Sequence, residues 1–429
     1  MKKYVMMIAA ILATVSSMTF TSCKEDELGD TIFDTTDYPL DKTAYTFPLD
    51  TFIKKNFQEP YNLRFIYKME DIGSDMQKNL IPASYEKSTD LAVLVKYLWI
   101  DVYKKLAGEE FLKVNCPRII HVIGSAGYNS DGTREGGVAE GGLKVTLMSV
   151  NELDPSKMEG LNAKGYPTGL NDLFFHTMHH EFGHILDQTH LRPSAFNTLS
   201  QGLYDNVGWG DKSDSIQAGL GFVTPYASSS QGEDWVEVLS CYITYNQKEW
   251  DRLLATAHFD WEEVDMTSTA YDSLFYRYDE NGKQLKPRLR QDQVDMDTIG
   301  YLRSTNSGES KCIRKVVPRT PEGWVIVDDN GNYTISTNGD NVDGRQVILD
   351  KLEMVRSWLH EHWEIDVDKL RQEVQQRQFV TDADGNFIFD AKGNYVNRLT
   401  YPLNGTSGQT LIDKLRQEVK AYEALQQKK

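Results

Sequence analysis

Cysteine and positive charge are both scarce in this chain of 429 residues. Only four cysteines are present, and none belongs to a Cys-x-x-Cys pair. This excludes a disulfide scaffold and gives no sign of a cysteine-ligated structural zinc. Lysine and arginine number 46 against 63 acidic residues, so the formal net charge is −17. Because phosphates repel such an excess of negative charge, we expect no nucleic-acid partner.

Long hydrophobic runs are also missing, apart from one near the N-terminus. The run from Val5 to Phe20 follows Lys2 and Lys3. It falls short of the roughly 20 residues that a membrane-spanning helix needs. A positive start followed by a short apolar core is typical of a signal peptide. We therefore expect residues 1–22 to be a cleaved signal peptide.

The end of this run resembles a lipoprotein signal, because the small residue Ser22 stands directly before Cys23. The resemblance implies lipidation of Cys23 by a diacylglycerol thioether and an acyl chain such as palmitate. Two or more acyl chains make a stable membrane anchor. The segment from Lys24 to Glu27 resembles the tag that directs Bacteroidetes-type lipoproteins to the outer face of the outer membrane. Residues 23–43 then form the lipidated cysteine and a flexible acidic tether.

Local patterns in the next part of the chain predict a mixed α+β domain. The segments 118–124 and 143–150 are typical of two strands, because each is a short apolar or alternating run. Asn171 precedes apolar residues that recur at helical spacing as far as Leu186, which predicts a helix capped by Asn171. We therefore expect a small sheet and helices within residues 44–248.

Beyond residue 248 the chain is richer in charge and in helical patterns. Residues 344–378 show a long amphipathic pattern, which indicates helical structure. Turn sequences at 384–386 and 392–394, flanked by aromatic residues, predict a β-hairpin or meander before a last helix. We expect residues 249–429 to form a mostly helical C-terminal region that bears this inserted hairpin.

The chemistry is carried by His180-Glu181-Phe182-Gly183-His184, which lies inside the predicted helix. His180 and His184 are one helical turn apart on the same face, so both imidazoles can reach a single Zn²⁺. Glu181 lies beside that position and can take a proton from a zinc-bound water, whose pKa zinc lowers toward about 7. The motif predicts a zincin-like metallohydrolase domain in residues 44–248.

A catalytic zinc needs a third protein ligand and one open position. One candidate is His190, whose spacing from His180 resembles the metzincin pattern. Asp187, however, stands where that pattern has a glycine, and no later methionine lies in an obvious Met-turn.

The other candidate is Glu233, at the start of a second predicted helix. Glu237 lies one turn later and can accept a hydrogen bond from the second nitrogen of a ligand histidine. This arrangement resembles gluzincin sites. The spacing from Tyr226 to Glu233 also resembles that of anthrax lethal-factor-like peptidases, which implies that Tyr226 stabilises an oxyanion. We favour Glu233 as the third ligand and keep His190 as the alternative.

Four features together resemble one family: Cys23 with its signal, and the segments 179–186, 221–228 and 233–237. It is the family of substrate import-associated zinc metallohydrolase lipoproteins, which are similar to accessory proteins of TonB-dependent nutrient importers. The resemblance implies Zn²⁺ as the cofactor and a peptide or glycopeptide as the substrate. It implies a TonB-dependent importer and its surface binding lipoprotein as partners.

The family usually has histidine at position 187, so Asp187 departs from its pattern. No role is therefore carried over to Asp187 or to His190.

Two hypotheses about function follow. In the first, the protein is a zinc metallopeptidase in which His180, His184 and Glu233 hold the metal, Glu181 is the general base, and Tyr226 stabilises the oxyanion. In the second, it is a non-catalytic binding or assembly subunit of an importer with a vestigial zinc site. The intact Glu181 argues against the second, because a structural zinc has no need of that carboxylate.

Overall fold

The computed structural model describes residues 40–69, 78–128, 134–135, 137–140, 144–160, 168–265, 277–279, 281–285, 300–301, 310–321, 325–326, 328–330, 334–338, 341–405 and 407–426. The predicted signal peptide, Cys23 and almost all of the tether lie outside these residues. Residues 43–429 belong to one structural unit. Among the helices of the described residues, none has the length and apolar character needed to cross a membrane.

The described chain begins with helices that precede and alternate with the first strands of a small sheet. They are α2 (Phe47–Ile53), a π-helical turn (Lys54–Gln58), α3 (Glu59–Tyr61), α4 (Tyr85–Val95), a second π-helical turn (Lys96–Ile100), α5 (Asp101–Ala107) and α6 (Glu109–Asn115). Gly108 separates α5 from α6 because its φ of 89° lies in the left-handed region that glycine adopts at no steric cost.

The sheet contains four strands in the order β1-β2-β6-β5. They are β1 (Arg64–Ile66), β2 (Ile119–Val122), β6 (Lys144–Leu147) and β5 (Gly137–Glu140). The first three are parallel and β5 is antiparallel to β6. The strands predicted at 118–124 and 143–150 correspond to β2 and β6. A separate pair consists of β3 (Gly127–Tyr128) and β4 (Arg134–Glu135).

The motif of residues 180–184 lies on α7 (His176–Thr189), which follows a π-helical segment (Asn171–Phe175). The prediction that Asn171 caps this helix is wrong, since no side chain caps either segment. The Asn171 amide instead donates hydrogen bonds to the Thr244 carbonyl at 3.2 Å and to Gln378 Oε1 at 3.1 Å. Partners distant in sequence therefore take the side chain away from the local backbone.

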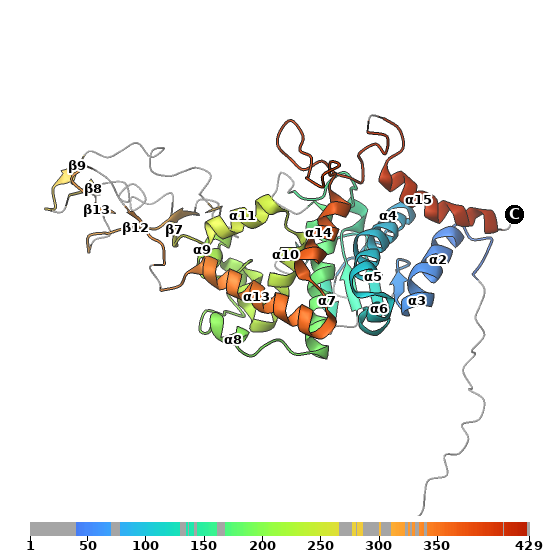
Figure 1. Ribbon diagram of the computed structural model, residues 1–429, viewed down its shortest axis with the longest axis horizontal. Coiled ribbons are helices and arrows are strands. Elements are labelled where there is room, and N and C mark those ends of the chain that lie inside the picture. The colour runs from blue at the N-terminus through green and yellow to red at the C-terminus, as the bar shows by residue number, and fades with distance from the viewer. Residues whose placement is uncertain are drawn as a thin grey trace, which may run out of the picture. The chain divides into compact units, whose positions relative to one another are not determined.

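Further helices follow α7 in the central part of the chain. They are α8 (Phe196–Leu199), a 3₁₀ turn (Trp209–Asp211), α9 (Asp214–Gly219), a 3₁₀ turn named η7 (Tyr226–Ser229), α10 (Gln231–Thr244) and α11 (Gln247–Thr256). Figure 1 shows α10 among α7, α13 (Gly344–Trp363) and α14 (Val367–Gln378), and it contacts all three. The centre of the protein is therefore helical.

Among the described residues between 261 and 335, the C-terminal region also contains short strands, which the sequence did not predict. They are β7 (Trp261–Asp265), β8 (Arg277–Tyr278), β9 (Gln284–Leu285), β10 (Gly300–Tyr301), β11 (Ser310–Arg314), β12 (Val316–Val317), β13 (Val325–Ile326) and β14 (Thr334–Ile335). They pair in the orders β10-β11-β7, β12-β14 and β13-β8-β9. Most contain only two residues, which is too short for an alternating pattern to appear in the sequence.

The long amphipathic pattern of residues 344–378 corresponds to two helices, α13 and α14. Glu364 ends α13 in a left-handed conformation with φ of 56°. The segment between α14 and α15 (Leu411–Lys420) contains isolated antiparallel bridges, which pair Phe379 with Asn397, Thr381 with Phe387 and Phe389 with Tyr395. These bridges flank both predicted turns, but no strand of the predicted β-hairpin or meander is present in the described residues of this segment.

One hydrophobic core extends from α2 to α15 and includes residues on both sides of position 248. The mixture of helices and a small sheet agrees with the α+β class expected from the sequence. The division into domains at residues 44–248 and 249–429 stays a prediction.

Candidate metal centre

Close packing of two helices positions the candidate site. On one side of α7, the Phe182 ring packs against Trp99 and Tyr103, with centroids 5.0 and 4.9 Å away. Gly183 faces α10, where an added Cβ would lie 2.9 Å from Val236 Cγ1. Glycine within a helix costs about 1 kcal/mol, and here its absent side chain lets α7 and α10 approach.

The N-terminus of α10 is held by three kinds of contact. Ser230 caps the helix, because its Oγ accepts a hydrogen bond from the Glu233 backbone N–H at 3.3 Å. Trp235 packs edge-to-face against Trp358 of α13. Lys351 of α13 forms an ion pair with Asp234 at 2.6 Å, and both side chains are 0% exposed. The backbone that carries Glu233 is therefore fixed from several directions.

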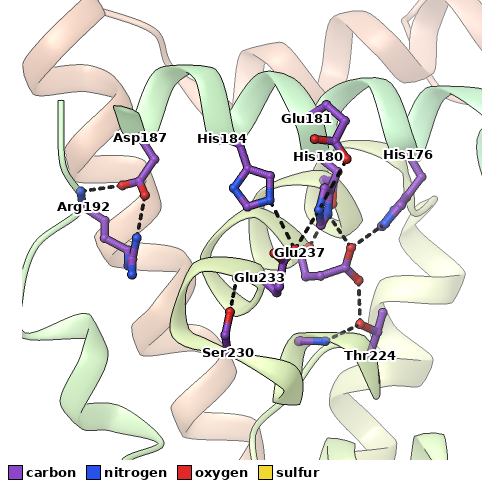
Figure 2. A network of polar contacts seen from close by, with 12 residues as sticks. His176, His180, Glu181, His184, Asp187, Arg192, Thr224, Ser230, Glu233 and Glu237 are labelled. Carbon is purple, nitrogen blue, oxygen red and sulfur yellow. Dashed lines mark hydrogen bonds and ion pairs between the residues drawn. The ribbon is translucent and has the colours of Figure 1, made fainter. Parts of the chain in front are cut away.

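The structure brings His180, His184 and Glu233 together between these helices (Figure 2). Glu233 Oε2 lies 3.0 Å from His180 Nε2 and 3.2 Å from His184 Nε2. The three ligand atoms all lie within 4.8 Å of one another. Two imidazoles and one carboxylate are a known ligand set of catalytic zinc. The residues present therefore fit a zinc ion in donor type and spacing.

Proximity within the cluster shifts the pKa values of its members. Burial alone acts to raise the pKa of Glu233, but hydrogen bonds from His180 and His184 outweigh it and lower that pKa to about 2. Burial alone acts to lower the pKa of His180, but hydrogen bonds to Glu233 and Glu237 raise it to about 10. In the metal-free protein at neutral pH, Glu233 is therefore ionised and His180 protonated.

Glu181 lies beside the cluster, with its Oε1 3.9 Å from His180 Nε2. Its side chain is largely buried, and this burial raises the pKa of the carboxyl group above its ordinary value. A carboxylate with a raised pKa is a better proton acceptor near neutral pH. This position and environment suit a general base.

Tyr226 borders the cluster from the turn η7. Its ring centroid lies 5.8 Å from that of His180 and 4.8 Å from that of Trp209. The side chain is 37% exposed, so it stands between the cluster and solvent. Burial, followed by the charge of Glu233, raises the pKa of Tyr226. The phenol is therefore protonated at neutral pH and can donate a hydrogen bond.

Glu237 contacts the cluster through the second ring nitrogen of His180. Its Oε1 lies 2.7 Å from His180 Nδ1 and 2.8 Å from His176 Nε2, and its Oε2 accepts a hydrogen bond from Thr224 Oγ1 at 2.5 Å. Burial alone would raise the pKa of Glu237, but His176 and His180 hold it well below its ordinary value. The ionised carboxylate accepts from His180 Nδ1, which leaves Nε2 available to a metal.

His176, Glu237 and Cys241 form a second group whose ligand atoms lie within 4.8 Å of one another. Both oxygens of Glu237 already accept hydrogen bonds from the side chains around it. We therefore interpret this group as support for His180. His176 has a local signal in the sequence, one helical turn before His180. Thr224 lies in the segment 221–228, but no pattern in the sequence gave it a role.

His190 does not join the cluster. Its ring stacks on His362 with a centroid distance of 4.4 Å, and its carbonyl accepts a hydrogen bond from Trp358 Nε1. Asp187 does not end the helix as the metzincin glycine would, because α7 continues to Thr189. Its carboxylate accepts hydrogen bonds from the backbone and guanidinium of Arg192. Of the two candidate third ligands, the structure brings only Glu233 to the histidines.

Comparisons with known proteins identify a zinc-binding family. A family model described as "Putative zinc-binding metallo-peptidase" matches residues 42–368. The chain is also similar to a solved structure of a "putative zinc-binding metallo-peptidase" from Bacteroides caccae. The identity is 27%, the TM-score is 0.49, and the match covers 77% of this chain and 91% of that chain. No curated protein matches the chain. Since the family model spans most of its length, the chain belongs to this zinc-binding metallopeptidase family.

Proposed function

We propose that the protein is a zinc-dependent metallopeptidase that cleaves peptide bonds with an activated water molecule. The observation that carries this proposal is the convergence of His180, His184 and Glu233, from two helices, at a point bordered by Glu181 and Tyr226. Family membership supports the zinc-binding part of the proposal.

Each residue then has a separate role. His180, His184 and Glu233 would hold the ion, and zinc, when bound, supplies Lewis acidity that polarises a carbonyl group and acidifies water. Glu181 accepts the proton of the attacking water and passes it to the leaving amine. Tyr226 donates a hydrogen bond to the negative charge that develops on the carbonyl oxygen.

The location and partners of the enzyme are part of the same proposal. The sequence around Cys23 supports a lipid anchor in the outer membrane that faces the extracellular side. The resemblance to importer-associated lipoproteins supports a TonB-dependent importer and its surface binding lipoprotein as partners. A peptide or glycopeptide outside the cell is then the substrate.

The test is the substitution Glu181→Gln in the mature protein. We expect the variant to keep its zinc, because Glu181 is not a ligand, and to lose roughly 10²–10⁴-fold in peptide hydrolysis, because the general base is gone. Zinc content is measured by elemental analysis and hydrolysis with a library of peptides and glycopeptides. Glu59→Gln, at an exposed ion pair with Lys55, is the matched control.

Two results would contradict the proposal. A wild-type protein that takes up no divalent metal removes its basis. A protein that retains zinc but cleaves no member of the library favours the non-catalytic importer subunit.

A further inference from the structure

Glu237 of α10 connects three elements next to the candidate zinc ligands: α10 itself, α7 and the loop before η7. Its Oε1 accepts hydrogen bonds from His180 and His176 of α7, at 2.7 and 2.8 Å. Its Oε2 accepts a hydrogen bond from Thr224, in the loop before η7, at 2.5 Å. The Glu237 side chain is 3% exposed, so these donors replace the water that an ionised carboxylate would otherwise bind. Each of them therefore contributes to the orientation of Glu237.

The Thr224 hydroxyl makes two hydrogen bonds in opposite senses. It donates its proton to Glu237, and its oxygen accepts a hydrogen bond from the Ala227 backbone N–H at 3.1 Å. Ala227 belongs to η7, the turn that carries Tyr226. Figure 2 shows Thr224 beside Glu237, on the opposite side of that carboxylate from the histidines of α7. A single oxygen thus joins the support of a candidate metal ligand to the turn that presents Tyr226.

We propose that Thr224 is a positioning residue. It fixes His180 through Glu237 and Tyr226 through the turn η7, and so holds the two relative to each other. The proposal rests on the proposed function, because it assigns Thr224 to the same zinc site. Without the hydroxyl, Glu237 Oε2 lacks a donor in a buried environment, and the carboxylate holds His180 less firmly. The turn that carries Tyr226 loses an anchor at the same time.

The substitution Thr224→Val tests this role, because valine keeps the shape of threonine and lacks the hydroxyl. We expect the dissociation constant for zinc to rise about 10-fold and kcat to fall about 10-fold. KM should stay unchanged, since Tyr226 acts on charge that develops in the transition state. Thr224→Ser keeps the hydroxyl and should restore most of both values. Zinc affinity, measured by competition with a chelator, does not depend on turnover.

Ser228→Ala is the matched control. Ser228 Oγ donates a hydrogen bond to the Pro225 carbonyl in the same turn, at 2.7 Å. Its removal loosens the turn while the hydrogen bond between Thr224 and Glu237 remains. We expect zinc affinity to equal that of the wild type. If Thr224→Val does not fold, Thr224→Ala compared with Thr224→Ser gives the same contrast between absence and presence of the hydroxyl.

Three outcomes overturn the proposal: zinc affinity and kcat unchanged in Thr224→Val, a Thr224→Ser variant as impaired as the valine variant, or a loss of zinc affinity in Ser228→Ala as large as that in Thr224→Val. They differ from a failure of the proposed function, in which the wild-type protein itself binds no zinc or cleaves no peptide.

Discussion

The helices α7 and α10 have 14 residues each and contribute to the site from opposite sides, yet they differ in how their functional residues are placed. On α7 the two histidines are fixed relative to each other by one turn of helix. On α10 the position of Glu233 depends on the contacts of the helix as a whole with α7 and α13. One helix therefore carries a motif, and the other becomes part of the site only through packing.

The contacts of α10 illustrate the difference. Its neighbour on α13, Lys351, donates a hydrogen bond to the Gly221 carbonyl at 2.8 Å and forms the buried ion pair with Asp234. The Tyr204 hydroxyl also donates to Asp234, at 2.8 Å. A helix that belongs to the C-terminal part of the sequence thus holds the residue next to Glu233. The position of Glu233 therefore depends on Lys351, a residue far in sequence from the motif of residues 180–184.

The largest expected effect comes from removing the α10 ligand. Glu233→Ala should weaken zinc binding by more than the roughly 10–100-fold that loss of an outer-shell partner costs, because it removes a direct ligand. His184→Ala on α7 should have an effect of similar size. Chelator competition measures both. If Glu233→Ala binds zinc like the wild type, α10 contributes packing alone and the two helices are not equivalent partners.

The next largest effect should be a loss of stability when the buried ion pair between Lys351 and Asp234 is broken, although neither residue is a zinc ligand. Lys351→Met leaves Asp234 charged and buried without its cation, so the free energy of unfolding should fall by about 3–5 kcal/mol. Urea denaturation measures it. The matched control is Lys55→Met, at an exposed pair with Glu59, which should cost less than about 1 kcal/mol. Equal losses in the two variants would mean that the buried pair does not anchor α10.

A smaller effect concerns the protons that the ligands on the two helices must release when zinc binds. In the metal-free protein the pKa of His180 is about 10 and that of Glu233 about 2. At neutral pH His180 must therefore release a proton to bind zinc, whereas Glu233 need not. The apparent affinity for zinc should rise with pH, by up to about tenfold for each unit below that raised pKa. Calorimetry in buffers of different ionisation enthalpy counts the protons. An affinity that does not change with pH would contradict this assignment.

The smallest effect is expected at His190. Because its ring stacks on His362 and lies outside the ligand cluster, His190→Ala should leave the zinc content unchanged. Elemental analysis of the variant beside His184→Ala makes the comparison. Loss of zinc from His190→Ala would revive the metzincin-type alternative.

Particular residues show how far the sequence could predict this structure. The strands β2 and β6 were found because short apolar runs bounded by turn residues are a local signal. The break between α13 and α14 was not found, because Glu364 adopts its left-handed conformation without the glycine that normally announces one. Asn171 looked like a helix cap and instead binds Thr244 and Gln378. In each failure, a partner or conformation invisible to the local pattern determined the outcome.

The third ligand shows the same limit within the site. Spacing along the chain kept both Glu233 and His190 open, since each lies at a distance from His180 that a known pattern allows. The choice required the path of the backbone after α7, which carries His190 toward α13.

By itself, the sequence determined that His180 and His184 share one face of a helix with Glu181 beside them, because the pitch of an α-helix converts spacing directly into geometry. Only the tertiary structure decided that Glu233, Glu237 and Thr224 meet that face, because their placement depends on how α10 and η7 pack against α7. Side chains from separate elements come together through the shape of the whole core, to which residues far apart in the sequence contribute.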